Sequence, residues 1–194
     1  YPSPYRTGMS SLGFLQIYKI LQAEPGLACE RFFLPDEADK TEVAPVGYEQ
    51  HRALSDFALI AMSVAYELEL AGVVQLLESS GIPSLREERG ETHPFVLAGG
   101  PLTFSNPLPL AAYADAIIMG EAEELVVPAI RSALDSGSKR EALAKLADLP
   151  HVFVPELHGA AMPGVAKADA SCLPAWAPIR TPDTELSNMF LIET

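Results

Sequence analysis

The chain has 194 residues, of which 48% are hydrophobic and 20% charged, and its formal net charge is −13. This length accommodates one α/β domain of roughly 150 residues with a sizeable core, followed by a tail. The acidic balance argues against direct binding of nucleic acid and against docking on anionic lipid, since both need clustered Lys and Arg. No apolar run reaches the ~18 residues that span a bilayer, so we expect no membrane partner.

In chain order, hydrophobic spacing and Gly or Pro breaks predict alternating helices and strands. The expected elements are a helix over 12–22, a strand over 30–34, a strand over 57–64, a helix over 67–80, a strand over 94–98, a strand over 114–119, helices over 121–136 and 138–146, and an edge strand over 151–154. Continuous apolar runs such as 57–64 are typical of strands buried on both faces of a sheet.

Repeated strand–helix units indicate a mostly parallel sheet with helices on both faces. We therefore predict a doubly wound, flavodoxin-like α/β domain over residues 1–154, whose first strand lies immediately before Tyr1. Residues 155–187 contain several prolines and are predicted to be an extended linker, and 188–194 a short strand. The side chains expected in the core are those of Phe57, Leu59, Ile60, Val96, Leu97, Ile117 and Ile118.

Ligands in such a sheet bind outside the carboxyl ends of the strands, so candidate site residues are sought in the loops there. They are Ser10 and Ser11 in the first loop, Ser63 in the second, Gly99 and Gly100 in the third, and Gly120 in the fourth. Each has a structural alternative: the hydroxyls can cap helices, and the glycines can form turns. Glu121, Glu123 and Glu124 after Gly120 are likewise more typical of a helix start than of a metal site.

Cysteine-based and nucleotide-binding motifs are absent from the sequence. Cys29 and Cys172 stand far apart with no C-x-x-C pair, and the four histidines have no ligand spacing, so we predict no metal site. Neither G-x-G-x-x-G nor G-x-x-x-x-G-K occurs. No signal peptide is visible, which makes the cytoplasm the expected location.

Six phrases in a fixed order resemble one family, the cobalamin-binding-type radical S-adenosylmethionine proteins. They are Tyr1-Pro-Ser-Pro-Tyr-Arg-Thr-Gly-Met-Ser-Ser-Leu-Gly-Phe14, Glu30-Arg-Phe-Phe-Leu-Pro35, Met62-Ser-Val-Ala-Tyr-Glu67, Ala98-Gly-Gly-Pro101, Gly120-Glu-Ala-Glu-Glu124 and Thr181-Pro-Asp-Thr-Glu185. The family usually has Gly-Glu-Gly-Glu at the fifth phrase. The D-x-H-x-x-G motif, which supplies a lower histidine to cobalt in other cobalamin proteins, is absent.

The resemblance implies a Rossmann-like domain followed by a partial (β/α) barrel in the same chain. That barrel would hold a [4Fe–4S] cluster on a C-x-x-x-C-x-x-C loop beyond Thr194 and bind S-adenosylmethionine on the open iron. The radical chemistry of such an oxidoreductase would therefore lie outside this chain, which is not expected to be catalytic by itself. In this domain Ser63, Gly99 and Gly100 would line the face of a cobalamin, with the first loop beneath it.

Two other functions stay open from the residues alone. A Rossmann-like module could bind no cofactor and serve as an interaction or substrate-positioning domain. A flavodoxin-like flavin site would need a Ser/Thr-rich phosphate loop, of which Ser3, Thr7, Ser10 and Ser11 are a loose version.

Overall fold

The computed structural model describes residues 1–36 and 44–194. Its helices are α1 (Tyr5–Gly8), α2 (Leu12–Ala23), α3 (Glu69–Ser79), α4 (Val126–Leu134), α5 (Lys139–Ala147) and α6 (Pro155–His158), with 3₁₀ turns η1 (Leu54–Asp56), η2 (Arg86–Glu88), η3 (Pro101–Phe104), η4 (Leu108–Ala112) and η5 (Ala170–Cys172). Its strands are β1 (Leu59–Ser63), β2 (Phe95–Gly99), β3 (Ala116–Ile118), β4 (Val152–Phe153), β5 (Ala175–Trp176) and β6 (Ile192–Glu193).

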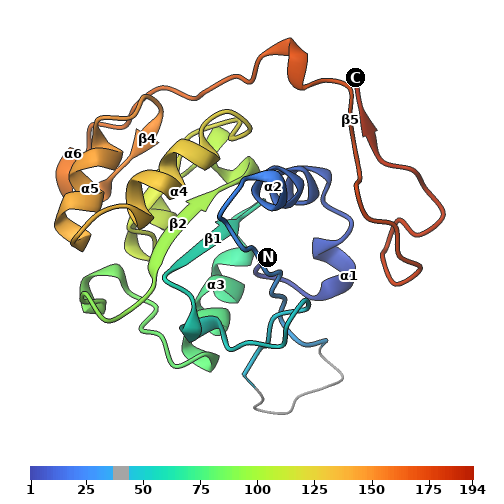
Figure 1. Cartoon of the computed structure of the whole chain (residues 1–194), viewed down its shortest axis with the longest axis horizontal. Helices are drawn as coiled ribbons and strands as arrows, with labels where there is room; N and C mark the ends of the chain where they lie inside the picture. Colours follow the sequence, from blue (N-terminus) through green and yellow to red (C-terminus); the bar gives the residue numbers. More distant parts are fainter. Residues whose placement is uncertain (37–43) are drawn as a thin grey trace.

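A four-stranded sheet in the order β1-β2-β3-β4 forms the centre of the molecule (Figure 1). β1, β2 and β3 are parallel, and β4 is an antiparallel edge strand beside β3. The β1–β2 register pairs Leu59 with Phe95 and Ser63 with Gly99, so both strands end at the same level. With helices on both faces, this arrangement confirms the predicted doubly wound α/β class.

The two faces of the sheet bury separate cores. On one face, Ile60, Met62, Val96 and Ile117 pack with residues of α3. On the other face, Leu97, Ala116 and Ile118 pack with α4, α5 and the end of α2. The predicted core residues Ile60, Val96, Leu97, Ile117 and Ile118 are buried.

A buried ion pair lies before β3, at the amino ends of the strands. The side chains of Arg89 and Asp115 are fully buried, with 3.3 Å between Arg89 Nη2 and Asp115 Oδ2. Asp115 Oδ2 also accepts the Val96 amide at 2.7 Å, and Lys139 Nζ lies 2.9 Å from Oδ1. Burial lowers the pKa of Arg89, and the neighbouring Asp115 opposes that effect. These contacts tie β2, β3 and α5 together at the end of the sheet opposite the candidate site.

Two predicted elements and the burial of two predicted core residues differ from the structure. Residues 30–34 are extended but do not form a strand, since only Leu34 forms a bridge, with Pro4. Phe57 and Leu59, which were expected in the core, are only half-buried, and Ala61 between them and Ser63 is exposed, because the face of β1 toward α2 borders open space. The helix expected from 121 begins only at Val126, because residues 121–125 hold the tail instead.

The tail from Pro155 onward is more ordered than a plain linker. It contains α6, η5 and β5, and β5 pairs in antiparallel fashion with β6 in a separate two-stranded sheet. The predicted terminal strand is therefore present as β6, although it is shorter than expected. Gln16 of α2 donates a hydrogen bond to the Trp176 carbonyl and joins this hairpin to the domain. Within the described ranges, none of the helices has the length and apolarity to cross a bilayer.

Candidate functional site

A cavity of about 540 Å³ lies between α2, the extended residues 28–32 and the α2-facing side of β1. Its size falls in the usual range for small-molecule sites. Among the residues that line it are Ser11, Phe14, Ile17, Leu21, Cys29, Leu59, Ala61, Ser63, Leu97, Gly99, Gly100, Phe104, Ile118, Gly120, Glu121 and Glu123. The cavity thus runs along β1 and opens toward the carboxyl ends of the strands.

The strand ends bring Ser63, Gly99, Gly100 and Gly120 to the rim of this cavity. Gly100 has φ +101°, and a Cβ added there would lie 2.7 Å from the Val64 carbonyl oxygen. Glycine at 100 is therefore required by backbone packing. An added Cβ at Gly99 would meet only ordinary contacts, the nearest being the Ile118 carbonyl oxygen at 3.7 Å. A side chain at Gly99 would therefore extend into the cavity, whereas a side chain at Gly100 would collide with the backbone of Val64.

The fourth loop binds the tail of the same chain. Gly120 has φ +90° and pairs with Ala166 in a parallel bridge, and its amide donates to Thr103 Oγ1 at 3.0 Å. The carboxylate of Glu121 accepts the amide of Ala168, and Glu124 accepts that of Asp169. Two of the three acids therefore hold the backbone of the tail.

The two serines of the first loop have different positions. Ser11 caps α2 by accepting the Phe14 amide at 3.4 Å, and it lines the cavity. Ser10 donates to the Arg6 carbonyl at 2.8 Å and accepts the Glu185 amide from the tail at 3.1 Å. Ser10 is not among the residues that line the cavity, so the structure brings together the other five predicted site residues without it.

Glu69 joins the first loop to the second. Its carboxylate accepts the Ala65 amide at 2.6 Å and the Ser3 hydroxyl at 3.0 Å, and the residue is only 3% exposed. One turn along α3, a Cβ at Gly72 would overlap the Pro2 carbonyl oxygen. The first loop is therefore packed tightly on the start of α3, which leaves the open space on the α2 side of β1.

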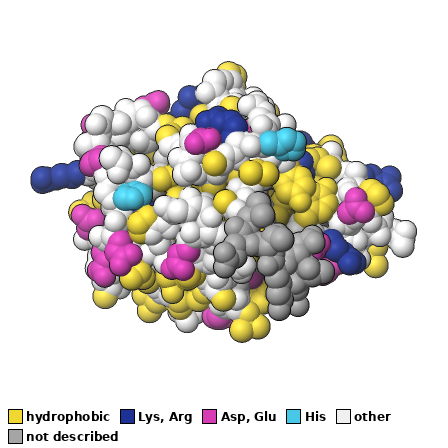
Figure 2. Space-filling model, turned by 90° about the horizontal axis from the view of Figure 1, so that it is seen from below, with side chains coloured by type: hydrophobic (Ala, Val, Ile, Leu, Met, Phe, Trp, Pro, Cys, Tyr) yellow, Lys and Arg dark blue, Asp and Glu magenta, His cyan; other side chains and the backbone are white. Residues whose placement is uncertain are grey.

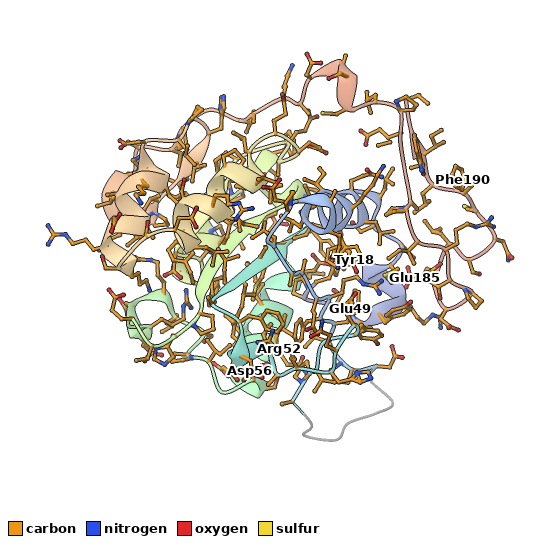
Figure 3. All side chains as sticks on the ribbon, in the orientation of Figure 1. Tyr18, Glu49, Arg52, Asp56, Glu185 and Phe190 are labelled. Atoms are coloured by element: carbon orange, nitrogen blue, oxygen red, sulfur yellow. The ribbon has the colours of Figure 1, made fainter. Side chains whose placement is uncertain are left out.

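The far wall of the cavity was not expected from the sequence. Phe14, Ile17 and Leu21 come from one face of α2, and their i, i+3, i+7 spacing is the only sequence signal for them. In Figure 3, Tyr18 of α2 and Glu49 lie close together; the Tyr18 hydroxyl donates to Glu49 Oε1 at 3.0 Å. Glu49 Oε1 also lies 2.7 Å from Arg31 Nε, which fixes the extended segment against α2.

The cavity lining is mostly apolar, and its cysteine is not activated. Burial raises the pKa of Cys29 to about 11, so its thiol is protonated at neutral pH and is not an activated nucleophile. Among the described residues no group of three His, Cys, Asp or Glu could hold a metal ion, so these side chains do not fit a [4Fe–4S] cluster. Figure 2 shows Lys and Arg scattered across one face rather than gathered in a groove.

These features define a mostly parallel α/β domain with an apolar cavity that opens toward the carboxyl edge of its sheet. The chain matches the family model described as "Radical SAM proteins, N-terminal" over residues 13–155, and it belongs to that family. Membership implies a [4Fe–4S] cluster and S-adenosylmethionine in the parent protein. No curated protein and no solved structure matches the chain.

Proposed function

We propose that this domain serves a radical S-adenosylmethionine enzyme by binding cobalamin at the carboxyl ends of β1, β2 and β3. The observation that carries the proposal is the cavity rim, where Ser63 and Gly99 end paired strands beside Gly120. A barrel following in the same chain would supply the radical, and this domain would present the ligand to it.

The residues at the rim fit a corrin ring on three counts. Because Gly99 has no side chain, a bulky flat ligand can lie against its backbone. The Ser63 hydroxyl can hydrogen-bond to the edge of that ligand. Apolar side chains such as Ile17 and Leu97 dominate the wall, as a macrocycle requires. None of the four histidines is among the lining residues, so cobalt would have no histidine ligand from the described part of this chain.

The test uses the protein expressed from the complete gene. Hydroxocobalamin should remain bound through gel filtration, with an absorption spectrum that lacks a histidine lower ligand. Gly99→Leu should weaken retention about tenfold or more, because overfilling a packed site costs roughly 1–3 kcal/mol. Gly90→Leu is the matched control: a Cβ at Gly90 meets nothing within 4 Å, and the residue is exposed before β2.

Two results would contradict the proposal. Loss of all corrinoid during gel filtration of the complete protein would favour the alternative, a module without cofactor that positions substrate or a partner. The close packing of the first loop on Glu69 and Gly72 is the observation that favours this alternative, since it closes the crevice beside α3. Equal loss of binding in Gly99→Leu and Gly90→Leu would place any cobalamin elsewhere.

A further inference from the structure

Glu123 is the acid of the fourth loop that does not hold the tail. Glu121 and Glu124 accept amides of the tail, whereas Glu123 lines the cavity. The residue is half-buried as a whole, but its Oε2 atom is fully buried and has no hydrogen-bond partner among the described residues. α4 begins only at Val126, and the side chain just before it makes no capping hydrogen bond. Glu123 therefore has a buried acceptor that neither the tail nor the start of α4 uses, and such an atom is costly to leave without a donor.

The cavity lies on the same side of the chain as Glu123. Val126, Ile130 and Leu134 of α4 line it at intervals of four residues, and Glu123 precedes the first of them by three. Positions three and four apart share one face of a helix, and residues 123–125 form the turn that leads into α4. In Figure 1, α2 and α4 lie side by side on one face of the sheet, where residues of both helices share a core. Glu123 thus continues the α4 wall of the cavity toward the carboxyl ends of the strands.

The charges around the cavity disfavour an anionic ligand. Among the lining residues that the structure describes, four are acids and one is a cation. The acids are Glu30, Glu121, Glu123 and Glu193. The cation, Arg31, is already paired, because its Nε lies 2.7 Å from Glu49 Oε1. Charges beside apolar walls are screened less than charges in water, so a phosphate or carboxylate placed near Glu123 would be repelled.

We propose that Glu123 determines which ligand the cavity accepts, by receiving a hydrogen bond from an N–H group on an otherwise apolar molecule. The ligand is an apolar ring system with an ammonium or amide group. Its body lies against Leu97 and Ile118, and its N–H group meets Oε2 of Glu123. A flavin mononucleotide is disfavoured, since its phosphate adds a like charge to this acidic lining. The inference rests on the proposed function only in that the same cavity binds the ligand; a corrin, with amides at its edge, is one member of this class.

Three matched probes test the preference on the protein expressed from the complete gene. Naphthylethylamine, naphthaleneacetamide and naphthaleneacetic acid share one ring system and differ in the polar group, and equilibrium dialysis measures their binding. The amine and the amide should each bind about tenfold more tightly than the acid, the factor that one hydrogen bond to a charged group contributes. Ala61→Phe fills the cavity from the exposed centre of β1 and should weaken both donor probes, which locates them there.

Glu123→Gln keeps the size of the side chain and an acceptor oxygen but removes the charge. The amine should then bind about tenfold less tightly, the acid several-fold more tightly, and the amide about as before. Glu123→Ala should weaken the amide as well, because no acceptor oxygen remains. Glu88→Gln is the matched control: it removes the same charge from an exposed residue of η2 and should leave all three affinities unchanged.

Three results would overturn the proposal. They are a failure of both donor probes to bind more tightly than the acid, an equal effect of Glu123→Gln and Glu88→Gln on the three affinities, and unchanged binding in Ala61→Phe. Each can occur while hydroxocobalamin stays bound to the complete protein. Conversely, the probes can rank as expected while all corrinoid is lost, so failure of the ligand preference is distinguishable from failure of cobalamin binding.

Discussion

The amino group of Tyr1 should make the stability of the chain that begins there depend on pH. Burial lowers its pKa from 8.0 to about 5, while Glu69 of α3 and Cys29 of the extended segment oppose the shift. Between these values the unfolded state binds the proton and the folded state does not. The free energy of unfolding should therefore rise from pH 5 to pH 8, with a slope approaching about 1.4 kcal/mol per pH unit, and level off above pH 8.

Urea unfolding across this pH range measures the effect. The matched control is the same chain with the Tyr1 amine acetylated, which keeps all four histidines and removes only the titrating group. Subtracting the two curves isolates the amine. If both forms show the same pH dependence, the nitrogen is accessible to solvent and its burial in the fold is incorrect.

Asp115 should be among the most sensitive positions for stability. Its carboxylate is fully buried, accepts the Val96 amide and lies against Arg89, whose side chain is also buried. Asp115→Asn leaves a buried guanidinium without its counter-charge, which costs about 3–5 kcal/mol in comparable sites. Lys139→Met should cost less, because Lys139 is 17% exposed and the Arg89 pair stays intact. Denaturant titration compares the two, and an equal or larger loss in Lys139→Met would contradict this ranking.

At the scale of elements, the sequence predicted those that bury a continuous apolar run or a regular face. β1, β2, β3 and α2 all lie within a few residues of their predicted bounds. Residues 30–34 carry a strand-like pattern but have too little paired backbone beside them, and hydrogen-bonded neighbours are not visible in a local pattern. The start of α4 was misplaced because the acids at Glu121 and Glu124 bind amides of the tail, which lie more than forty positions away.

The hydrogen bonds from the tail to Glu121 and Glu124 should keep the tail attached to the domain. Glu121→Ala combined with Glu124→Ala removes the acceptors for the amides of Ala168 and Asp169. The tail should then detach locally, and trypsin should cut after the exposed Lys167 several-fold faster. Cleavage after Arg140, an exposed residue of α5, reports the remaining fold and should not change. An unchanged rate at Lys167 would mean that the Gly120–Ala166 pairing alone retains the tail.

For the whole molecule, the sequence predicted residues at the rim of the candidate site but not the apolar cavity behind them. Ser63, Gly99, Gly100 and Gly120 were found because the carboxyl ends of parallel strands must meet at one edge. The cavity behind them depends on how far α2 stands from β1, a tertiary property without a local signal. Ser10 was included for its place in the first loop, yet it contacts Arg6 and the tail.

The last prediction concerns the chain beyond the hairpin of β5 and β6. Ile192 of β6 and Phe190 just before it are exposed, and a two-stranded sheet is marginally stable by itself. Figure 3 shows Phe190 on the tail, far from Tyr18 and Glu49. Packing against a following barrel would cover this apolar surface, and family membership implies the cluster such a barrel holds. The gene should therefore encode C-x-x-x-C-x-x-C within a few residues of Thr194.

Reading the gene tests this directly, and the purified protein tests its chemistry. The complete protein reconstituted with iron and sulfide should show the absorption and electron paramagnetic resonance of a [4Fe–4S] cluster, and replacing any of the three motif cysteines by alanine should abolish both signals. Cys29→Ala and Cys172→Ala should leave the cluster intact, since neither belongs to a group of ligands among the described residues. A stop codon directly after Thr194 would separate this domain from radical chemistry in its own chain, and it could then serve such chemistry only in a complex with a second protein.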